Sequence, residues 1–289
     1  MIVVTGNCLS SGYEMLDPVI FDQDFQEIIE LPPTEYFNVR MDKIYDKFFR
    51  HNPKFEKINK KSAHVRRILA QKKIKELEHE VSWPVILGKK LNIEVLNISN
   101  LAANFTQTLD RFEHALKNDN VRPSHVIHLI PGHFKVSIET DHDSMASYVL
   151  LGNKRSALVT PSILQYDTIL HNLKKIFVKP TGKYHLCEEY KKLVRDEDFF
   201  DNRIKQGLKR NRILEKEFGY KTFYLLSEIA TKSCMGDEII LHDDLKQFAR
   251  ENFKTGSECP ITEEYTDYMI DLVSSSLKIN YVKNSKRTS

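Results

Sequence analysis

Cys8 is the residue best placed to do chemistry, because of the sequence around it. A short apolar run leads directly into Gly6, Asn7 and Cys8, and Gly12 follows four residues later. A strand that ends in a small-residue turn and opens a helix points a side chain out of the carboxyl edge of a sheet. Helix N–H groups favour negative charge there, so this thiol can ionise and act as a nucleophile. The alternative is a small apolar side chain packed in a core, the commonest fate of a free cysteine.

A nucleophile usually works with a base, although a thiol can ionise without one, and His133 is the candidate base that the sequence offers. It follows Pro131 and Gly132 at the end of a β-rich run, on the rim where ligands bind in open α/β sheets. As a base it would take the proton of the Cys8 thiol; the alternative is a solvated loop histidine.

Residue types that bind metals occur in two short clusters, but neither predicts a metal site. The cluster 141–143 (Asp-His-Asp) is packed too closely to converge on one ion. The cluster 242–244 (His-Asp-Asp) is interpreted as a helix start with Asp243 as the N-cap. The four cysteines lack C-x-x-C spacing, which favours reduced thiols over a zinc site or a disulfide framework. We therefore expect no metal and no cofactor.

The elements that must position Cys8 follow from hydrophobic periodicity. Helical patterns separate the β-rich runs, and this alternation is typical of βαβ units and predicts a parallel sheet. The β-rich runs are 1–5, 93–98, 125–130 and 222–226, and the helical segments include 62–81, 85–91 and a helix from Phe105 to Leu116. The fold class expected is therefore α/β, a short flavodoxin-like parallel sheet with helices on both faces.

The remaining segments complete the predicted organisation as one α/β domain over residues 1–279. Residues 17–53 contain Pro32 and Pro33 and are interpreted as a helix-poor connection over the sheet edge. A helical elaboration is expected at about 160–218, and its basic stretch between Lys205 and Lys216 is interpreted as a solvated helix face that could still meet a phosphate. Residues 280–289 form a polar, basic tail that we expect to be mobile.

Composition and charge limit the classes of partner that this chain is expected to have. The chain has 43 Lys and Arg against 40 Asp and Glu, a formal charge of +3, so nucleic-acid binding is not indicated without a concentrated patch. No apolar run is long enough to span a membrane, and polar residues begin at Thr5, unlike a signal peptide. We expect a cytoplasmic protein with no membrane partner; the oligomeric state is not indicated.

The opening segment resembles the Gly-Asp-Ser-x-x-x-Gly block of the SGNH (GDSL-type) esterase and acyltransferase superfamily. Gly6 and Gly12 stand in register, Asn7 takes the place of the Asp, and Cys8 takes the place of the nucleophilic Ser. The resemblance is closest to the small GDSL-like proteins of bacteriophage genomes and surface-polysaccharide loci, and it implies the flavodoxin-like SGNH fold.

Later blocks extend the resemblance in the expected order. The stretch 82–97 resembles the family pattern of Ser-Trp-Pro, helix, strand and Asn. In the next block Ala102 occupies the Gly position, whose backbone N–H helps to hold an oxyanion, and Asn104 matches the family Asn. Asn104 has a second interpretation, because with Gln107 it forms a capping-box pattern for the helix that begins at Phe105. The two roles of Asn104, substrate contact and helix cap, stay open here.

Two catalytic blocks depart from the family. Where Gly-x-Asn-Asp is expected, the chain has Gly132 followed by His133, so the second oxyanion donor is missing. In the last block Cys259 stands at the position of the catalytic His and no Asp precedes it. A Cys8–Cys259 redox pair is one alternative for this position.

The resemblance implies an esterase or acyltransferase descendant that acts on an acylated carbohydrate, a small-molecule or carbohydrate ester. Cys8 would be the nucleophile, and the backbone N–H groups near Cys8 and Ala102 would hold the oxyanion. Because the Asp-x-x-His pair is lost, weak or altered activity is expected. The alternatives are a catalytically silent SGNH-fold binding protein and an acyl-CoA-binding polysaccharide-modifying enzyme. Gly6-Asn7-Cys8 also resembles the Gly-Asn-Cys-Gln opening of a family of the latter kind, with Leu9 replacing the Gln.

Overall fold

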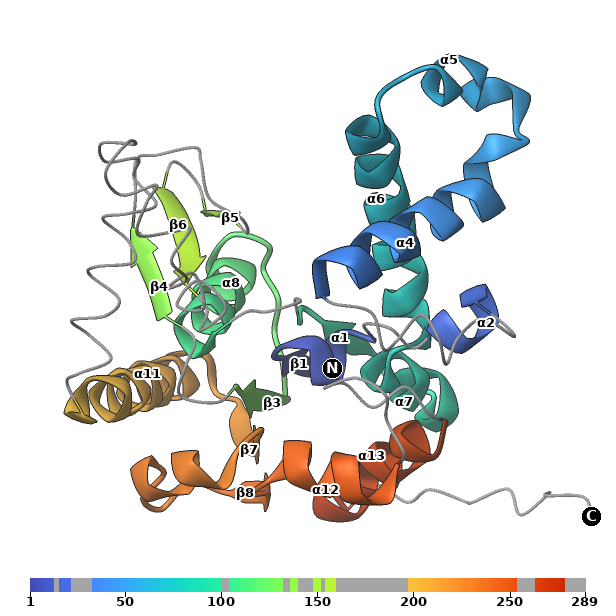
Figure 1. Cartoon of the computed structure of the whole chain (residues 1–289). Helices are drawn as coiled ribbons and strands as arrows, with labels where there is room; N and C mark the ends of the chain where they lie inside the picture. Colours follow the sequence, from blue (N-terminus) through green and yellow to red (C-terminus); the bar gives the residue numbers. More distant parts are fainter. Residues whose placement is uncertain are drawn as a thin grey trace, which may run out of the picture. The chain divides into compact units, whose positions relative to one another are not determined.

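The computed structural model describes residues 1–12, 16–21, 33–99, 104–131, 136–139, 148–151, 154–159, 197–253 and 263–278 (Figure 1). The chain divides into two compact units. Unit 1 comprises Met1–Cys8 and Ile98–Leu245, and unit 2 comprises Leu9–Asn97 and Lys246–Ser289.

A five-stranded sheet carries the fold, in the order β2-β1-β3-β7-β8. The β1–β3, β3–β7 and β7–β8 pairs are all parallel. The strands are β1 (Ile2–Thr5), β2 (Val95–Asn97), β3 (His125–Ile130), β7 (Lys221–Leu226) and β8 (Ile240–His242). The order corresponds to 2-1-3-4-5, which is the flavodoxin-like arrangement. The predicted α/β fold class and its parallel sheet are confirmed, and β8 is a strand that the sequence analysis did not predict.

The three central strands, β1, β3 and β7, are buried because their sequences are almost continuously apolar. Val3, Val4, Val126 and Ile127 have no exposed surface, as expected for parallel strands that are covered on both faces. The register places Thr5 opposite His128 in the β1–β3 pair. This pairing brings the single polar residue of β1 next to a buried histidine.

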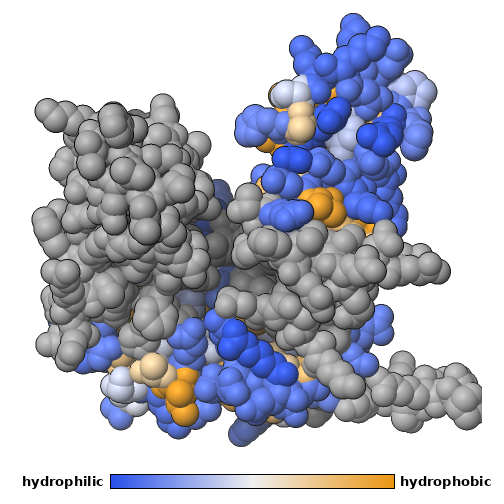
Figure 2. Space-filling model, viewed as in Figure 1, coloured by the Kyte–Doolittle hydropathy of each residue, from blue (hydrophilic) through white to orange (hydrophobic). Residues whose placement is uncertain are grey.

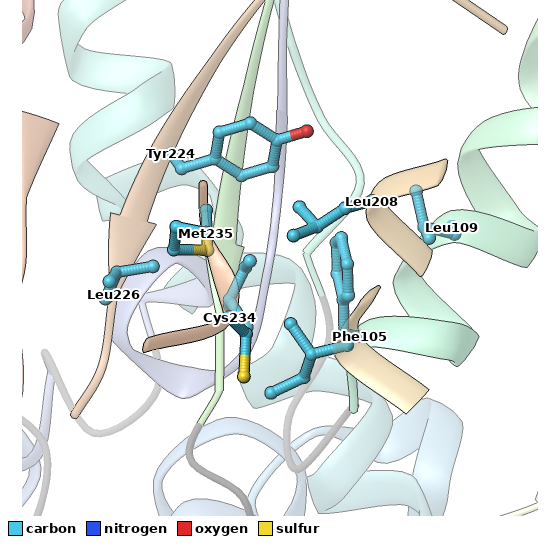
Figure 3. Packing of buried hydrophobic residues seen from close by; sticks show 9 residues of the cluster. Phe105, Leu109, Leu208, Tyr224, Leu226, Cys234 and Met235 are labelled. Carbon is cyan, nitrogen blue, oxygen red and sulfur yellow. The ribbon is translucent and has the colours of Figure 1, made fainter. Parts of the chain in front are cut away.

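Two long helices pack on each other in unit 1, α8 (Phe105–Lys117) and α11 (Glu197–Phe218). Gly207 on α11 permits the close approach, because a Cβ there would lie 2.6 Å from the Phe105 ring. A buried cluster joins these helices to β3, β7 and the 3₁₀ helix η5 (Ile229–Cys234), with Phe105, Leu208 and Tyr224 among its members (Figure 3). The predicted helices around Phe105 and Lys205 are confirmed.

A second, smaller sheet also belongs to unit 1. It has three antiparallel strands in the order β4-β6-β5. They are β4 (Val136–Glu139), β5 (Tyr148–Leu151) and β6 (Lys154–Val159). The sequence analysis predicted no strand in this region. Residues 160–196, the first part of the predicted helical elaboration, and residues 280–289, the predicted tail, lie outside the described residues.

The described part of unit 2 is helical apart from β2. Its helices are α1 (Cys8–Ser11, which begins at the last residue of unit 1), α2 (Asp17–Phe21), α4 (Pro33–Tyr45), the π-helix η2 (Asp46–Arg50), the 3₁₀ helix η3 (Pro53–Phe55), α5 (Glu56–Asn59), α6 (Ala63–Val81), α7 (Trp83–Leu91), α12 (Leu245–Asn252) and α13 (Glu263–Ser276). The predicted helices at 62–81 and 85–91 are confirmed as α6 and α7. Helix α12 begins at Leu245, one residue later than the predicted N-cap Asp243 implies, and α13 begins at Glu263.

The expectation of a helix-poor connection over residues 17–53 is wrong. The described part of this segment is mostly helical, and Met41, Ile44, Tyr45 and Phe49 form a buried cluster with residues of α6. Pro33 was interpreted as a sign of a helix-poor segment, but it stands at the start of α4, where a helix tolerates the missing N–H group. The spacing of the apolar residues after the prolines was the better signal.

Among the described helices, none is both long and apolar enough to span a membrane.

Candidate functional site

Cys8 lies where the sequence places it, at the first residue of α1 and just beyond the carboxyl end of β1. Gly6 and Asn7 form the turn between strand and helix, and both are buried. For Cys8 itself the described atoms are those of the backbone.

This position is a topological switch point of the sheet. On one side of β1 lies β3; on the other, Ile98, which directly follows β2, donates its N–H to the Val4 carbonyl at 2.9 Å. The chain continues from β1 to β2 on one side and from β3 towards β7 on the other, and in open α/β sheets such a reversal opens a crevice beyond the carboxyl ends of the strands. Open α/β sheets bind their ligands at such points, and Cys8 here directly follows the turn at the carboxyl end of β1.

Side chains from distant elements hold the backbone of α1. The Leu9 carbonyl accepts hydrogen bonds from Trp83 Nε1 at 3.1 Å and from the Tyr265 hydroxyl at 3.2 Å. The Ser10 carbonyl accepts one from Asn97 Nδ2 at 2.8 Å. A helix of four residues cannot satisfy these carbonyls by itself, and each donor is buried. The backbone of Leu9 and Ser10, which follow Cys8, is therefore fixed by contacts from α7, α13 and β2.

Ser82 extends this support behind α1. Asn97 Nδ2 also lies 3.0 Å from Ser82 Oγ, and the Ser82 hydroxyl donates to the His79 carbonyl at 2.6 Å. The blocks that carried the family resemblance, Ser82-Trp83-Pro84 and Asn97, thus meet at the helix that follows the first block. Their shared role in the fold is to anchor α1.

Gly12 ends α1 at a position that only glycine accepts. Its φ of +78° lies in the left-handed region, and a Cβ there would be 2.1 Å from the Glu78 carbonyl oxygen. The close approach of α6 explains the glycine without a catalytic role.

A buried group of charged side chains lies in the same unit. Arg40 is almost completely buried, and its Nε lies 2.9 and 2.8 Å from the two carboxylate oxygens of Asp17. Arg40 Nη2 contacts Asp17 Oδ1 at 2.8 Å and also donates to Glu78, whose own backbone abuts Gly12. The Tyr36 hydroxyl donates to Asp17. We call these four residues the Arg40 cluster; it ties α2, α4 and α6 together near the end of α1.

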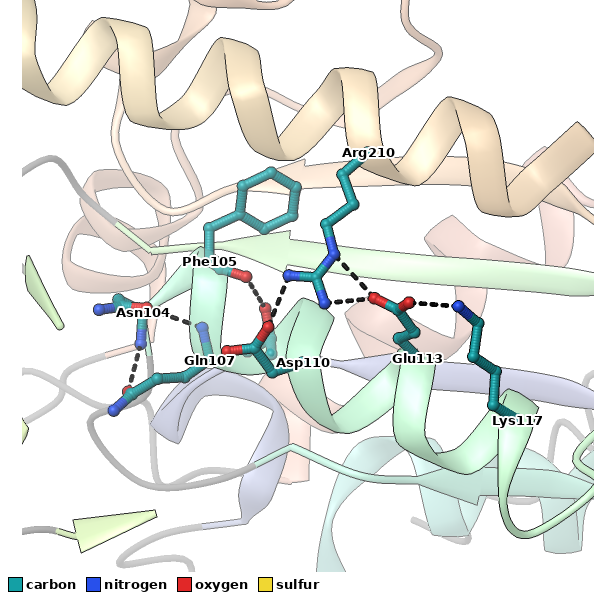
Figure 4. A network of polar contacts seen from close by, with 8 residues as sticks. Asn104, Phe105, Gln107, Asp110, Glu113, Lys117 and Arg210 are labelled. Carbon is teal, nitrogen blue, oxygen red and sulfur yellow. Dashed lines mark hydrogen bonds and ion pairs between the residues drawn. The ribbon is translucent and has the colours of Figure 1, made fainter. Parts of the chain in front are cut away.

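Asn104 forms the N-cap of α8 (Figure 4). Its Oδ1 accepts the Gln107 N–H at 2.9 Å, and Gln107 Oε1 accepts the Asn104 N–H at 3.3 Å, which completes a capping box. The structure therefore supports the capping interpretation of Asn104. Its side-chain oxygen is engaged by the helix.

Beyond this cap, α8 and α11 are joined by an ionic network (Figure 4). Arg210 binds Asp110 at 2.5 Å and Glu113 through Nε at 2.8 Å, and Lys117 binds Glu113 at 2.6 Å. Burial alone would raise the pKa of Glu113, but the hydrogen bonds from Lys117 and Arg210 outweigh it and lower the pKa. A shallow hollow of about 270 Å³ adjoins this network, and both of these cations are already paired there. The network therefore has a structural role, which is to hold α8 and α11 together.

Two histidines on strands of the main sheet, His242 and His128, are not placed to be the base for Cys8. His242 ends β8, which β3 and β7 separate from β1. At about 4.8 Å between neighbouring strands, it lies on the order of 14 Å to the side. Its Nδ1 accepts the Asp244 N–H at 3.1 Å, in keeping with a structural role at the start of α12.

His128 is fully buried, with both ring nitrogens engaged by Thr5 Oγ1 at 2.7 Å and Asn211 Oδ1 at 3.0 Å. Because the Asn211 oxygen can only accept, His128 Nε2 donates and Nδ1 accepts from Thr5. Burial lowers the pKa of His128 to about 4, which keeps the ring neutral. Asn211 uses its amide nitrogen on Thr222 and Tyr224, at 3.0 and 2.9 Å, and its oxygen also accepts from Tyr220 at 3.0 Å. These side chains form the His128 network, a closed polar core.

Cys234 shows what a purely structural cysteine looks like in this chain. It is 6% exposed, packs against Phe105 and Met235 in the core of unit 1, and burial raises the pKa of its thiol (Figure 3). A raised pKa disfavours the thiolate and therefore reactivity.

The other candidate residues of the sequence analysis, Ala102, Gly132, His133 and Cys259, lie outside the described residues, as do 141–143. In the described part of the chain, no three His, Cys, Asp or Glu residues gather as a metal site would require. The Arg40 cluster and Tyr265 were missed by sequence reasoning. Tyr265 lies 256 residues from its partner Leu9, and no local pattern announces such a pair.

Comparison with protein-family models, with curated proteins and with solved structures finds no match to this chain.

Proposed function

We propose that the protein is a thiol-dependent descendant of the SGNH esterases and acyltransferases, acting on an acylated carbohydrate with Cys8 as the nucleophile. The observation that carries the proposal is the position of Cys8, at the first residue after the β1 turn and at the switch point of a 2-1-3-4-5 parallel sheet. The acylated carbohydrate comes from the family resemblance.

The anchored backbone of α1 adds support. A nucleophile must be held in one place to gain from orientation, and α1 is held by the side chains of Trp83, Tyr265 and Asn97. None of these three donors is needed to close an ordinary helix. Their buried hydrogen bonds instead fix the position of one helical turn, which suits a backbone that must not move.

The proposed chemistry has two halves. The Cys8 thiolate attacks the ester carbonyl carbon, the bond from that carbon to the alcohol oxygen breaks, and the alcohol leaves with a proton supplied by His133 or by water. The acyl group is then held as a thioester. Water releases it as an acid in an esterase, and a second sugar hydroxyl accepts it in a transferase. Backbone N–H groups near Cys8 and Ala102 would bind the oxyanion in both halves.

Intact-mass measurement after incubation with p-nitrophenyl acetate tests the proposal. We expect a single added acetyl group that peptide mapping places on Cys8. The adduct should be absent in Cys8→Ala and retained in Cys234→Ala, the matched control for loss of a buried thiol. Steady-state hydrolysis should be slow, because the Asp-x-x-His pair is missing. Acetylation that persists unchanged in Cys8→Ala would remove Cys8 from the mechanism.

A second candidate is a catalytically silent binding protein with the same fold. Asn104 favours it, because the residue that matches the family's substrate-binding Asn has its side-chain oxygen committed to the capping box. This candidate predicts that Cys8 is labelled by iodoacetamide last among the four thiols. The nucleophile proposal predicts that Cys8 is labelled first, and one native labelling experiment near pH 7 therefore separates the two.

A further inference from the structure

One part of unit 2 has a charge quite unlike that of the chain as a whole. Residues 47–75 contain eleven Lys and Arg and one acidic residue, Glu56, whereas the whole chain has a formal charge of only +3. These residues form η2 after its first residue, Asp46, together with η3, α5 and the first two thirds of α6, and we call them the basic arm. The balance of the whole chain conceals this local excess.

The basic arm turns its aromatic residues inward. The Tyr45 and Phe49 rings lie 5.6 Å apart and the Phe49 and Phe55 rings 4.8 Å apart, within the cluster that joins α4 to α6. The outer surface is left to hydrophilic side chains, which cover most of the arm at the upper right of Figure 2. The arm therefore presents positive charge on a packed scaffold.

The arginines of the arm are already engaged. Arg67 binds Asp42 at 2.6 Å and Asn38 at 2.7 Å. Arg66 donates to the Asn59 carbonyl at 3.2 Å and lies over the Tyr45 ring, and Arg50 pairs with Asp46 at 3.0 Å.

Four lysines remain available. Lys54, Lys57, Lys61 and Lys72 are exposed, and their ammonium groups make no ion pair within the part of the chain that the structure describes. They are distributed over η3, α5, the turn after it and α6. The available charges are therefore point charges on flexible stems, without the planar forks that read base edges.

We propose that the basic arm binds the phosphate backbone of duplex nucleic acid without regard to sequence. A duplex carries a charge about every 1.7 Å along its axis, which is the density that such a concentrated group of ammonium ions complements. Lysine ammonium groups suit phosphate oxygens, and the arginines, whose planar groups make the most specific base contacts, are engaged within the protein.

An anionic membrane is the main competing surface. Two apolar residues on α6, Val65 and Ile68, are 40% and 54% exposed. Interfacial helices insert a continuous apolar face with bulky residues, but here the aromatic rings of the arm lie in its own core. The observations therefore favour the duplex.

Fluorescence anisotropy with a labelled DNA duplex of mixed sequence tests the proposal on the full chain. If the four lysines each contact one phosphate, the logarithm of affinity should fall with the logarithm of salt concentration with a slope of about −3.6. Raising the salt from about 50 to 150 mM should then weaken binding about 50-fold. A second duplex of unrelated sequence should bind equally well.

Two charge-matched variants locate the binding surface. The arm variant replaces Lys54, Lys57, Lys61 and Lys72 with Gln; the control replaces the exposed Lys205, Lys209, Lys216 and Lys221 of unit 1 with Gln. We expect the arm variant to lose nearly all of the salt-dependent affinity and the control to keep most of it, with unchanged circular dichroism in both. The proposal is overturned by equal losses in both variants, by a loss confined to the control, or by wild-type protein that binds phosphatidylserine vesicles but not the duplex.

Discussion

Units 1 and 2 both bury polar side chains, but they do so in opposite ways. The core of unit 1 holds the His128 network, in which every group is neutral and each polar position of Asn211 has a partner. Unit 2 holds the Arg40 cluster, in which one guanidinium serves two buried carboxylates.

The two arrangements differ in the free-energy cost of removing one of their residues. A neutral network that loses one member leaves a hydrogen-bonding group unsatisfied, which costs on the order of 1–3 kcal/mol. A buried ion cluster that loses its central charge leaves like charges facing each other out of water, which costs more. We therefore expect the stability of unit 2 to depend strongly on one residue, Arg40. The stability of unit 1 should depend on several residues, each with a smaller contribution.

The largest effect is expected for Arg40→Met. The change leaves Asp17 and Glu78 buried without their shared cation, and we expect a loss of about 3–5 kcal/mol in the free energy of unfolding. Urea denaturation gives the total, and hydrogen exchange should assign the loss to unit 2.

Two further variants sharpen this result. Arg67→Met breaks a pair that is 28% exposed on the arginine side and should cost less than about 1 kcal/mol. Replacing Asp17 and Glu78 by Leu in the Arg40→Met background should recover much of the loss, because an apolar replacement removes the stranded charges. If the free energy of unfolding is not recovered, the altered packing geometry around Arg40, and not the unpaired charge, causes the loss of stability.

The second effect is the acid sensitivity of unit 1. The pKa of His128 is lowered by burial from 6.5 to about 4, so the unfolded chain binds a proton more readily than the folded one. The neutral histidine thus contributes stability that is fully present above pH 6.5 and is lost as the pH falls towards 4, about 3 kcal/mol in all.

His128→Gln should flatten the stability profile between pH 4 and 6.5. His64→Gln, which removes an exposed histidine of unit 2, is the control and should leave the slope unchanged. A slope that survives in His128→Gln would assign the acid transition to other groups.

A smaller effect is expected for Tyr220→Phe. The change removes one donor to Asn211 Oδ1, but this oxygen keeps the hydrogen bond from His128 at 3.0 Å. We expect a loss of about 1.5 kcal/mol, measured by thermal unfolding. A loss as large as that of Arg40→Met would show that the neutral network also depends on a single residue.

The same contrast explains what the sequence could predict. Periodicity identified β1, β3, β7, α8 and α11, because fully buried strands are continuous apolar runs and amphipathic helices repeat their apolar residues every three to four positions. The turn that presents Cys8 was also predictable, because its residues are adjacent in the chain.

The Arg40 cluster could not be predicted in this way. Arg40 lies 23 residues from Asp17 and 38 from Glu78, and charged residues in a Pro-containing segment resemble a solvated loop until the fold brings them together. The anchor on α1 was found only in part. Ser82, Trp83 and Asn97 were noticed through family resemblance, and Tyr265 has no neighbouring motif. The basic arm, in contrast, can be found by counting charges over a short window of the sequence. The near-neutral net charge of the whole chain does not indicate it.

The smallest effect concerns Asn104, a candidate site residue whose side chain caps α8. Asn104→Ala removes the N-cap of α8 and should cost about 1 kcal/mol, whereas Asn104→Ser keeps an oxygen that can accept the Gln107 N–H and should cost only a few tenths. If capping is the whole role of Asn104, the Ser variant should acetylate at Cys8 as fast as the wild type. A Ser variant that keeps its thermal stability but loses Cys8 acetylation would instead show that the Asn104 amide contacts the substrate, and would place a neutral, structural side chain of unit 1 in the chemistry.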